Sequence, residues 1–438
     1  MIGQRIKNFN LGKLKKTTVT ASSGLLLLMT FAKDIGLIEA LERVLSHLKK
    51  RRRGYTVSEK ILSFVQMLIK GGNRLSDIDV LRSDPGLMDI LMMEHFPRPN
   101  TIGDLARKFR GKDIHRLAEV VMSVASRMIR AKGLKAVVLD MNSSLVASEV
   151  KIAEKTYEGY RGFNPLLGIL KGGGVSMAAF SVFRPGNCAP QSHNLSLLRK
   201  ISGYLKRHNP GLRLRVRMDS AGYNHRVMGF CEREGHEFVI AGDQYECILS
   251  IIKGIESWEP LRGGKEGEEV AEGIHFVGPE KEGAAYRFVV TRRRNEQLAL
   301  FAEFEYSYRV YFTNTDWSKH GVVYFYRQRA DAENVIKELK EGYAVENILS
   351  EEFLANAVFF QLELLAYNLV QYFKSNHLER SWWSLRIKQL RYWLINIAGV
   401  VVNHARKTIL RLSIHYKYFE TFREIYHLLC VRRVELRI

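Results

Sequence analysis

The sequence predicts a mixed α/β protein whose core is interrupted by a β-rich insertion and flanked by helical regions at both ends. Short apolar strands alternate with helical segments between Leu134 and Ala241, which is typical of a mixed α/β layer. Residues from about 244 to 315 alternate between apolar and polar and are divided by turns rich in Gly and Glu, which predicts strands. Before residue 130, apolar residues recur with the spacing of amphipathic helices.

These changes of pattern divide the chain into five parts. The central part is split in two by the insertion, so both halves are expected to fold into one core. The predicted parts are a helical region over residues 1–130, the first part of the core over 131–243, the β-rich insertion over 244–315, the second part of the core over 316–375, and a basic helical C-terminal region over 376–438.

The net charge favours a polyanionic partner. The chain carries 67 Lys and Arg against 46 Asp and Glu, a formal charge of +21. Nucleic acid is the commonest partner of so basic a protein, and an acidic membrane surface is the second candidate. A run of five cations, Lys49–Arg53, lies between two predicted helices. Such a run is either a solvated loop or a loop that contacts phosphates.

Cysteines and apolar runs point to a cytoplasmic protein without a membrane partner. The 4 cysteines show no CxxC or Cys/His ligand spacing, so we expect reduced thiols and no structural zinc. The longest apolar candidate, Phe353–Phe373, is interrupted by polar residues, including Glu363 and Asn368. A membrane span needs about 18 or more apolar residues with few charges, so this segment is predicted to be a buried core helix.

Three acidic residues stand at positions where the fold can bring them together. Asp140 and Asp219 are each predicted to end a strand, and Glu333 lies on a predicted helix. Carboxylates at strand ends, joined by one from a neighbouring helix, are the oxygen ligands that Mg²⁺ or Mn²⁺ prefers. Two such ions about 4 Å apart suit phosphodiester chemistry. We therefore expect Asp140, Asp219 and Glu333 to hold two divalent ions.

The segment Tyr326–Lys340 predicts one amphipathic helix with a polar face suited to metal and phosphate together. At about 3.6 residues per turn, that face collects Tyr326, Arg329, Glu333, Lys337 and Lys340. The alternative is a solvated face on which Arg329 and Glu333 form an i,i+4 pair that contributes roughly a few tenths of a kcal/mol. The two interpretations differ in whether Glu333 faces other acids or only solvent.

The spacing Tyr326-x2-Arg329-x3-Glu333-x6-Lys340 resembles the signature of bacterial insertion-sequence transposases of the DDE type, in the group broadly related to insertion sequence four. Companion motifs occur in the same order as in that family. They are Tyr157–Leu166, Phe183–Asn187, Arg217–Tyr223 and Tyr311–Asn314. The resemblance extends from roughly residue 20 to residue 412.

This resemblance implies a ribonuclease-H-like catalytic core, a helical DNA-binding region over residues 1–130, and cut-and-paste transposition. Such an enzyme hydrolyses phosphodiester bonds at the ends of its element and joins the freed 3′ hydroxyls to target DNA. Asp140, Asp219 and Glu333 would hold the metal ions, while Tyr326, Arg329 and Lys340, with Lys337 on the same face, would bind DNA phosphates. The partners implied are double-stranded DNA and a second copy of the chain, acting at the nucleoid of a bacterial cytoplasm.

One departure from the family pattern leaves two interpretations open. Relatives read Asp-x-Asp-x-Thr/Ser around the first carboxylate, and this chain reads Asp140-Met141-Asn142-Ser143-Ser144. Residues 140 and 142 lie on the same face of a strand, so either can face the metal. We favour Asp140 as the ligand. If position 142 is the ligand, a neutral amide replaces a carboxylate, and the alternative function is a catalytically impaired transposase-derived DNA-binding protein.

Overall fold

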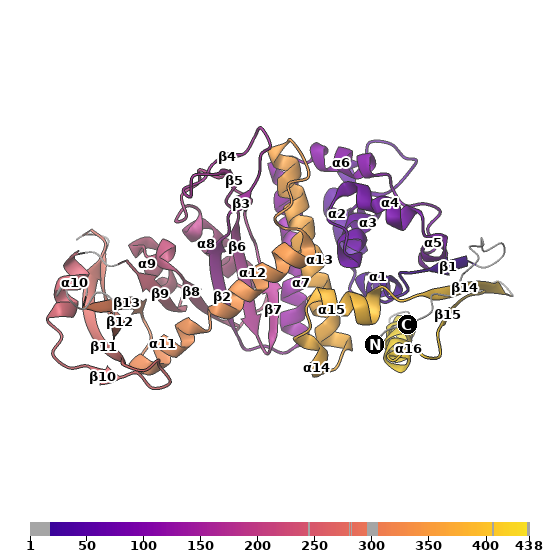
Figure 1. The fold of residues 1–438 in the computed structure, drawn as a ribbon. Helices are drawn as coiled ribbons and strands as arrows, with labels where there is room; N and C mark the ends of the chain where they lie inside the picture. Colours follow the sequence, from indigo (N-terminus) through magenta and orange to yellow (C-terminus); the bar gives the residue numbers. More distant parts are fainter. Residues whose placement is uncertain are drawn as a thin grey trace, which may run out of the picture.

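A nine-stranded mixed sheet runs through the centre of the computed structural model, which describes residues 18–243, 246–279, 281, 283–295, 305–404 and 407–435. The strand order is β10-β11-β12-β13-β9-β8-β2-β6-β7 (Figure 1). In chain order these strands are β2 Ala136–Ser143, β6 Leu166–Gly172, β7 Val175–Ala178, β8 Arg213–Met218, β9 Glu237–Gly242, β10 Glu259–Pro260, β11 Glu268–Val277, β12 Ala284–Arg294 and β13 Tyr306–Thr313.

The three strands in the middle of the sheet, β2, β8 and β9, are parallel, while β6 and β7 are antiparallel additions beyond β2. Apolar side chains fill most of β2, whereas along β8 arginines alternate with the buried Leu214, Val216 and Met218. Parallel pairing also brings the carboxyl ends of β2 and β8 to the same edge of the sheet. That edge is where we expect the polar side chains that follow these strands to meet.

The β-rich segment predicted as an insertion continues the core sheet. Strand β13 pairs antiparallel with β9, with Phe312 opposite Ile240, and β12, β11 and β10 follow outward. Along β12, Val289 packs in a cluster with α11 (Lys319–Arg327), whereas its neighbours Phe288 and Val290 pack into the main core. Alternate residues of a strand face opposite sides, so both faces of the extended sheet are covered.

Helix α13 (Phe353–His377) is the buried core helix that the sequence predicted. It is the one helix in the described part of the chain that is long and apolar enough to cross a membrane, and 89% of its most apolar stretch is buried inside the protein. Its Asn368 amide accepts a hydrogen bond from the Ala178 backbone N–H at 2.7 Å and donates to the Ala178 carbonyl at 2.8 Å. The helix therefore satisfies backbone groups of β7, an edge strand that would otherwise leave them unpaired.

The N-terminal part is helical, as predicted, and gathers at the end of the molecule opposite β10–β13 (Figure 1). Helices α3, α6 and α7 pack against α13, and α1 packs against α16 near the C-terminus. The helices are α1 Leu25–Asp34, α2 Leu37–Leu45, α3 Val57–Lys70, α4 Ile78–Arg82, α5 Pro85–Leu91, α6 Pro99–Lys108 and α7 Gly111–Ala131. The remaining helices are α8 Asn194–His208, α9 His225–Arg233, α10 Glu246–Lys253, α14 Arg380–Trp383, α15 Ile387–Leu390 and α16 Phe419–Glu435.

The C-terminal region is not wholly helical, and this part of the prediction is wrong. Strands β14 (Gly399–His404) and β15 (Lys407–Leu412) form a hairpin, and β1 (Thr18–Thr20) pairs antiparallel with β14. The physical reason is the β-branched run Val400–Val402, which favours a strand over a helix. A second small sheet joins β3 Val146–Ala147, β4 Glu154–Lys155 and β5 Arg161–Phe163.

The segment Tyr326–Lys340 is also not one continuous helix. Helix α11 ends at Arg327, Gln328 and Arg329 form a turn, and α12 (Ala330–Tyr343) begins afresh. Asp331 and Glu333 lie in the first turn of α12, where carboxylates are favoured by the helix dipole. The break places Arg329 at the start of a helix rather than within one.

Candidate functional site: Arg329 and the edge of the parallel strands

Asp219 and Asn142 mark the carboxyl ends of two neighbouring parallel strands. Strand β8 ends at Met218, and the next residue, Asp219, accepts a hydrogen bond from the Ala221 backbone N–H at 3.2 Å through Oδ1. Strand β2 continues through Ser143 because its pairing with β6 extends that far. The expectation that Asp140 ends its strand is therefore wrong, and Asn142 occupies the position near the strand end.

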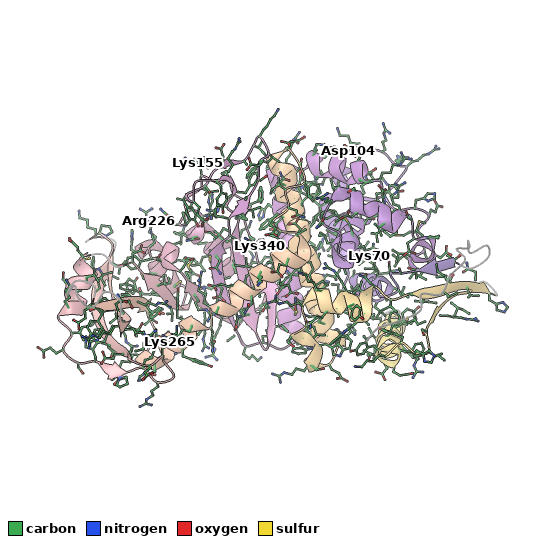
Figure 2. The ribbon with its side chains drawn as sticks, in the orientation of Figure 1. Lys70, Asp104, Lys155, Arg226, Lys265 and Lys340 are labelled. Carbon is green, nitrogen blue, oxygen red and sulfur yellow. The ribbon has the colours of Figure 1, made fainter. Side chains whose placement is uncertain are left out.

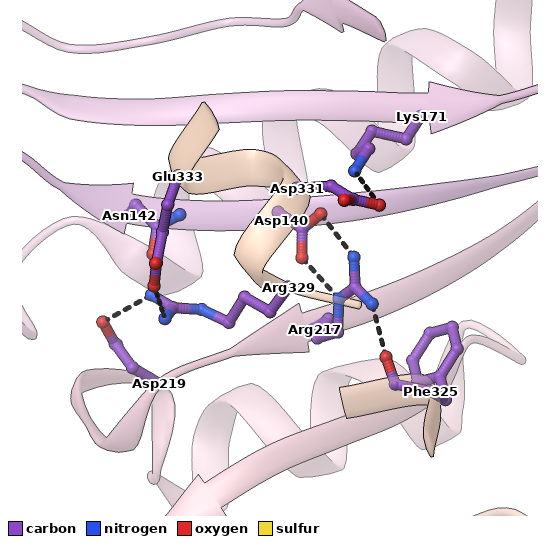
Figure 3. Close-up of polar contacts among 9 residues, drawn as sticks. All are labelled: Asp140, Asn142, Lys171, Arg217, Asp219, Phe325, Arg329, Asp331 and Glu333. Atoms are coloured by element: carbon purple, nitrogen blue, oxygen red, sulfur yellow. Dashed lines mark hydrogen bonds and ion pairs between the residues drawn. The ribbon is translucent and has the colours of Figure 1, made fainter. Parts of the chain in front are cut away.

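Arg329 connects three oxygen-bearing side chains from three elements. Its Nη2 donates to Asp219 Oδ2 at 3.0 Å and to Asn142 Oδ1, and its Nη1 donates to Glu333 Oε1 at 3.3 Å (Figure 3). Asp219 and Glu333 are 42% and 65% exposed, so a large substrate can reach both carboxylates. The structure thus brings Asp219 and Glu333 together with Asn142, around a single guanidinium group.

Asp140 lies behind this cluster in a buried ion pair. Its Oδ1 and Oδ2 accept hydrogen bonds from Arg217 Nε at 2.6 Å and Nη2 at 2.8 Å, and both side chains are almost completely buried. Arg217 Nη1 also donates to the backbone carbonyl of Phe325 near the end of α11 (Figure 3). Both carboxylate oxygens are committed to one arginine. Asp140 is consequently not among the side chains that meet at Arg329, contrary to the expectation from the sequence.

The other residues of the predicted polar face are spread apart. Tyr326 is packed against Tyr311, with ring centroids 4.6 Å apart, and burial raises the pKa of its phenol to about 12. Lys340 donates to the Leu145 carbonyl at 3.0 Å, so it lies just beyond the end of β2. Lys337 is 60% exposed and pairs with Glu341 at 3.7 Å. Phosphate binding by Tyr326, Lys337 and Lys340 stays a prediction.

The oxygen atoms around Arg329 suit a divalent cation. Two carboxylates and one amide oxygen are hard ligands of the kind that Mg²⁺ and Mn²⁺ prefer, and the guanidinium group stands in for the positive charge. Asn142 Nδ2 and Arg329 Nε are buried without a hydrogen-bond partner among the described residues. Both atoms are N–H donors, so a phosphate oxygen or a water can satisfy them, whereas a cation cannot. The site nevertheless has one carboxylate fewer than the three expected, and the described residues contain no cluster of three acidic, His or Cys side chains placed to hold a metal.

Sequence reasoning missed the role of Arg217. In the printed sequence Arg213, Arg215 and Arg217 alternate along one strand and look alike. Only the pairing of β2 with β8, which puts Arg217 directly beside Asp140, separates the buried arginine from the two others. One signal in the sequence could have pointed to this pair: Asp140 lies on an apolar strand, and a buried carboxylate needs a charged partner.

The fold and the site together define a mixed α/β protein with an acidic cluster at the edge of its parallel strands. The family model "Transposase DDE domain group 1" matches residues 13–433, and the chain belongs to this family. Among solved structures, a piggyBac transposase synaptic complex with hairpin DNA is similar at 12% sequence identity and a TM-score of 0.42, over 97% of this chain and 85% of that one. No curated protein matches the chain.

Proposed function

We propose that the protein binds double-stranded DNA at the ends of a mobile element, hydrolyses phosphodiester bonds there, and joins the 3′ hydroxyl ends to target DNA. The observation that carries this proposal is the contact of Arg329 with Asn142, Asp219 and Glu333, at a solvent-accessible edge of the sheet. Membership of a DDE transposase family and the net charge of +21 support a DNA substrate.

The proposed metal ligands are Asp219, Glu333 and the amide oxygen of Asn142. A bound Mg²⁺ or Mn²⁺ ion would supply activation of the attacking water or hydroxyl and charge neutralisation at the leaving oxygen. Arg329 donates hydrogen bonds to the same three side chains, and its fork of donors matches a phosphate group as well as a carboxylate. We therefore propose that Arg329 turns to a DNA phosphate when a cation binds. A second ion would have to share the same two carboxylates.

The strand order β9-β8-β2-β6-β7 supports a ribonuclease-H-like core, with three parallel strands followed by two antiparallel ones. The β-rich insertion then lies between the strand that precedes Asp219 and the helix that carries Glu333. We further propose a homodimer on DNA, since two element ends must be joined, and action at the nucleoid of a bacterial cytoplasm.

A second candidate function is DNA binding with impaired catalysis. Asn142 is the specific observation that favours it, because this neutral amide rather than a carboxylate meets Asp219 and Glu333 at Arg329. Neutralising divalent charge is the purpose of the third carboxylate, and an amide supplies only a dipole. In this case the protein would occupy element ends and cut them slowly or not at all.

One experiment separates the two functions. Purified protein is incubated with DNA carrying the element's own terminal repeats and Mg²⁺, and strand breaks and strand joining are measured. Breaks made by the natural protein and abolished by Glu333→Gln support the transposase. DNA binding without breaks, with cleavage gained in Asn142→Asp, supports the impaired form. Protein that neither binds nor cuts such DNA contradicts both.

A further inference from the structure

A cationic cavity of about 350 Å³ lies on the face of the sheet covered by α11. The charged side chains that line it are those of Lys265, Glu268, Arg293, Arg309 and Arg327. These side chains come from the loop before β11 and from β11, β12, β13 and α11, so segments far apart in the sequence converge on it. Lys265 lies at the end of the molecule formed by β10–β13 (Figure 2). None of these residues contacts the cluster around Arg329.

Among the residues that the structure describes, those lining the cavity carry an excess of positive charge. Arg327 pairs with Glu268. Within the described part of the chain, no carboxylate pairs with Lys265, Arg293 or Arg309. Three cations that converge on one hollow repel one another unless an anion lies between them.

Part of the wall is rigid before any ligand arrives. Arg327 is fixed through Glu268, whose side chain is only 9% exposed. Arg292 alternates with Thr291 and Arg293 along β12, so its guanidinium, which lies over the rings of Trp258 at 4.0 Å and Tyr306 at 4.5 Å, is on the opposite face of the sheet and does not form this wall. A solvated cationic face, the simpler interpretation, does not require an arginine to be held by a buried carboxylate, as Arg327 is by Glu268. A binding site for an anion is favoured by such preorganisation.

The cavity lies close to the Arg329 cluster along the chain. Arg327 is the last residue of α11 and lines the cavity, and Arg329 follows two residues later. Two residues span at most about 7 Å between Cα atoms. A DNA backbone that reaches Arg329 can therefore reach the cavity within a few nucleotides.

We propose that this cavity binds a backbone phosphate of the DNA whose neighbouring phosphodiester lies at Arg329. The inference rests on the proposed function, because it assumes that DNA approaches the acidic cluster. The contact is independent of base sequence, since arginine and lysine bind phosphate by charge and leave base edges free. It fixes the register of the strand relative to Asp219 and Glu333 without taking part in the chemistry.

The test compares Arg293→Gln/Arg309→Gln with a control that removes two exposed arginines elsewhere, Arg207→Gln/Arg213→Gln. Both pairs lower the net charge equally, and all four side chains are exposed, so both variants are expected to fold. Binding to a terminal-repeat duplex and to a random duplex is measured by fluorescence anisotropy from 50 to 300 mM salt. EDTA is present, so cleavage plays no part.

We expect the cavity variant to bind both duplexes about tenfold more weakly and to lose about one to two units from the slope of log affinity against log salt, since each phosphate contact contributes about 0.9. The control should keep the natural slope. A cavity variant with the natural slope, or a control that loses as much, overturns the proposal.

Two further outcomes are informative. Natural protein that binds DNA but never cuts it leaves this proposal standing and removes only the catalytic part of the proposed function. Natural protein that binds no DNA overturns both. A final comparison measures melting in inorganic phosphate against chloride of equal ionic strength. If phosphate stabilises the natural protein but not the cavity variant, while the two bind DNA alike, the cavity is a site for free anions and the proposal fails.

Discussion

Asp140 and Arg217 are direct neighbours across the parallel strands β2 and β8, and they form a buried bidentate ion pair. Arg217 also donates to the Phe325 carbonyl, so the pair fixes the last turn of α11 against the sheet. The turn at Gln328 and Arg329 begins immediately after this anchor. The position of Arg329 in the acidic cluster thus depends on two residues that never contact the cluster.

Breaking this pair should destabilise the protein strongly. Arg217→Met leaves the Asp140 carboxylate buried without a partner, which typically costs about 3–5 kcal/mol in the free energy of unfolding. The double variant Asp140→Leu/Arg217→Met should recover most of that loss, because it buries no charge. Urea unfolding followed by tryptophan fluorescence measures both.

The matched control is Arg215→Met, on the same strand. Arg215 pairs with Glu237 at 2.6 Å, but both side chains are about one third exposed, so the loss should stay below about 1 kcal/mol. Equal losses in the free energy of unfolding for Arg215→Met and Arg217→Met would show that burial does not decide the cost of breaking these ion pairs.

Asn142→Asp should increase metal-dependent DNA cleavage. The substitution adds a carboxylate where Asn142 already meets Arg329, beside Asp219, and so increases the negative charge that holds a divalent ion. We expect at least about a tenfold gain in the rate of strand breaks with Mg²⁺, which corresponds to about 1.4 kcal/mol. Asp140→Asn is the companion variant. If Asp140→Asn abolishes cleavage while the stability of the protein is unchanged, Asp140 is a metal ligand. That outcome contradicts the proposed ligand role of Asn142.

Arg329→Gln should change metal binding and DNA binding in opposite directions. The guanidinium bonds to oxygens of the cluster, so a cation that binds these oxygens would compete with it. Removing this competitor should tighten Mn²⁺ binding several-fold by titration calorimetry, while affinity for DNA falls through the loss of a phosphate-binding group. Lys337→Gln, which removes an exposed charge one turn beyond Glu333, is the control for a general electrostatic effect on Mn²⁺ binding only, because Lys337 is itself predicted to bind DNA phosphate. Weaker Mn²⁺ binding in Arg329→Gln would contradict the proposed competition between the guanidinium and the cation.

Glu363→Gln should stabilise the protein at neutral pH. Glu363 is completely buried in α13, and burial raises the pKa of its carboxyl well above the usual value. A raised folded-state pKa means that stability is fully present below the unfolded-state pKa, near 4.5, and is lost as the pH rises towards the folded-state value. Because Gln carries no charge, Glu363→Gln should raise the free energy of unfolding by about 1 kcal/mol or more at pH 7. The gain should vanish below about pH 4, and a gain of equal size at pH 4 and pH 7 would exclude ionisation as its cause.

The general architecture could be predicted from the sequence because local periodicity decides it. The strand before Asp219, the helix that carries Glu333 and the buried helix over Phe353–Phe373 all follow from apolar spacing within each segment. Asp219 and Glu333 were both expected at the site, and the structure brings them together.

The features that the sequence did not predict all depend on contacts between distant segments. Strand β2 runs past Asp140 because β6 continues to pair with it through Ser143, and periodicity within β2 does not reveal the length of its partner. The break before Ala330 coincides with the anchoring of Phe325 by Arg217, more than 100 residues earlier in the chain. Position 142 rather than 140 meets Arg329 for the same reason: tertiary pairing, not local pattern, sets which residue reaches the edge.

The pairing of β1 with β14 has a consequence for the order of events during synthesis. Thr18–Thr20 finds its partner only when Gly399–Val401 exists, almost the whole length of the chain later. A ribosome that adds about 5–20 residues per second leaves the first strand unpaired for roughly 20–80 seconds. The N-terminal helices can assemble earlier, but the small sheet closes only after residue 401 has been synthesised. A chain that stops before residue 399 therefore lacks the strand with which Thr18–Thr20 pairs.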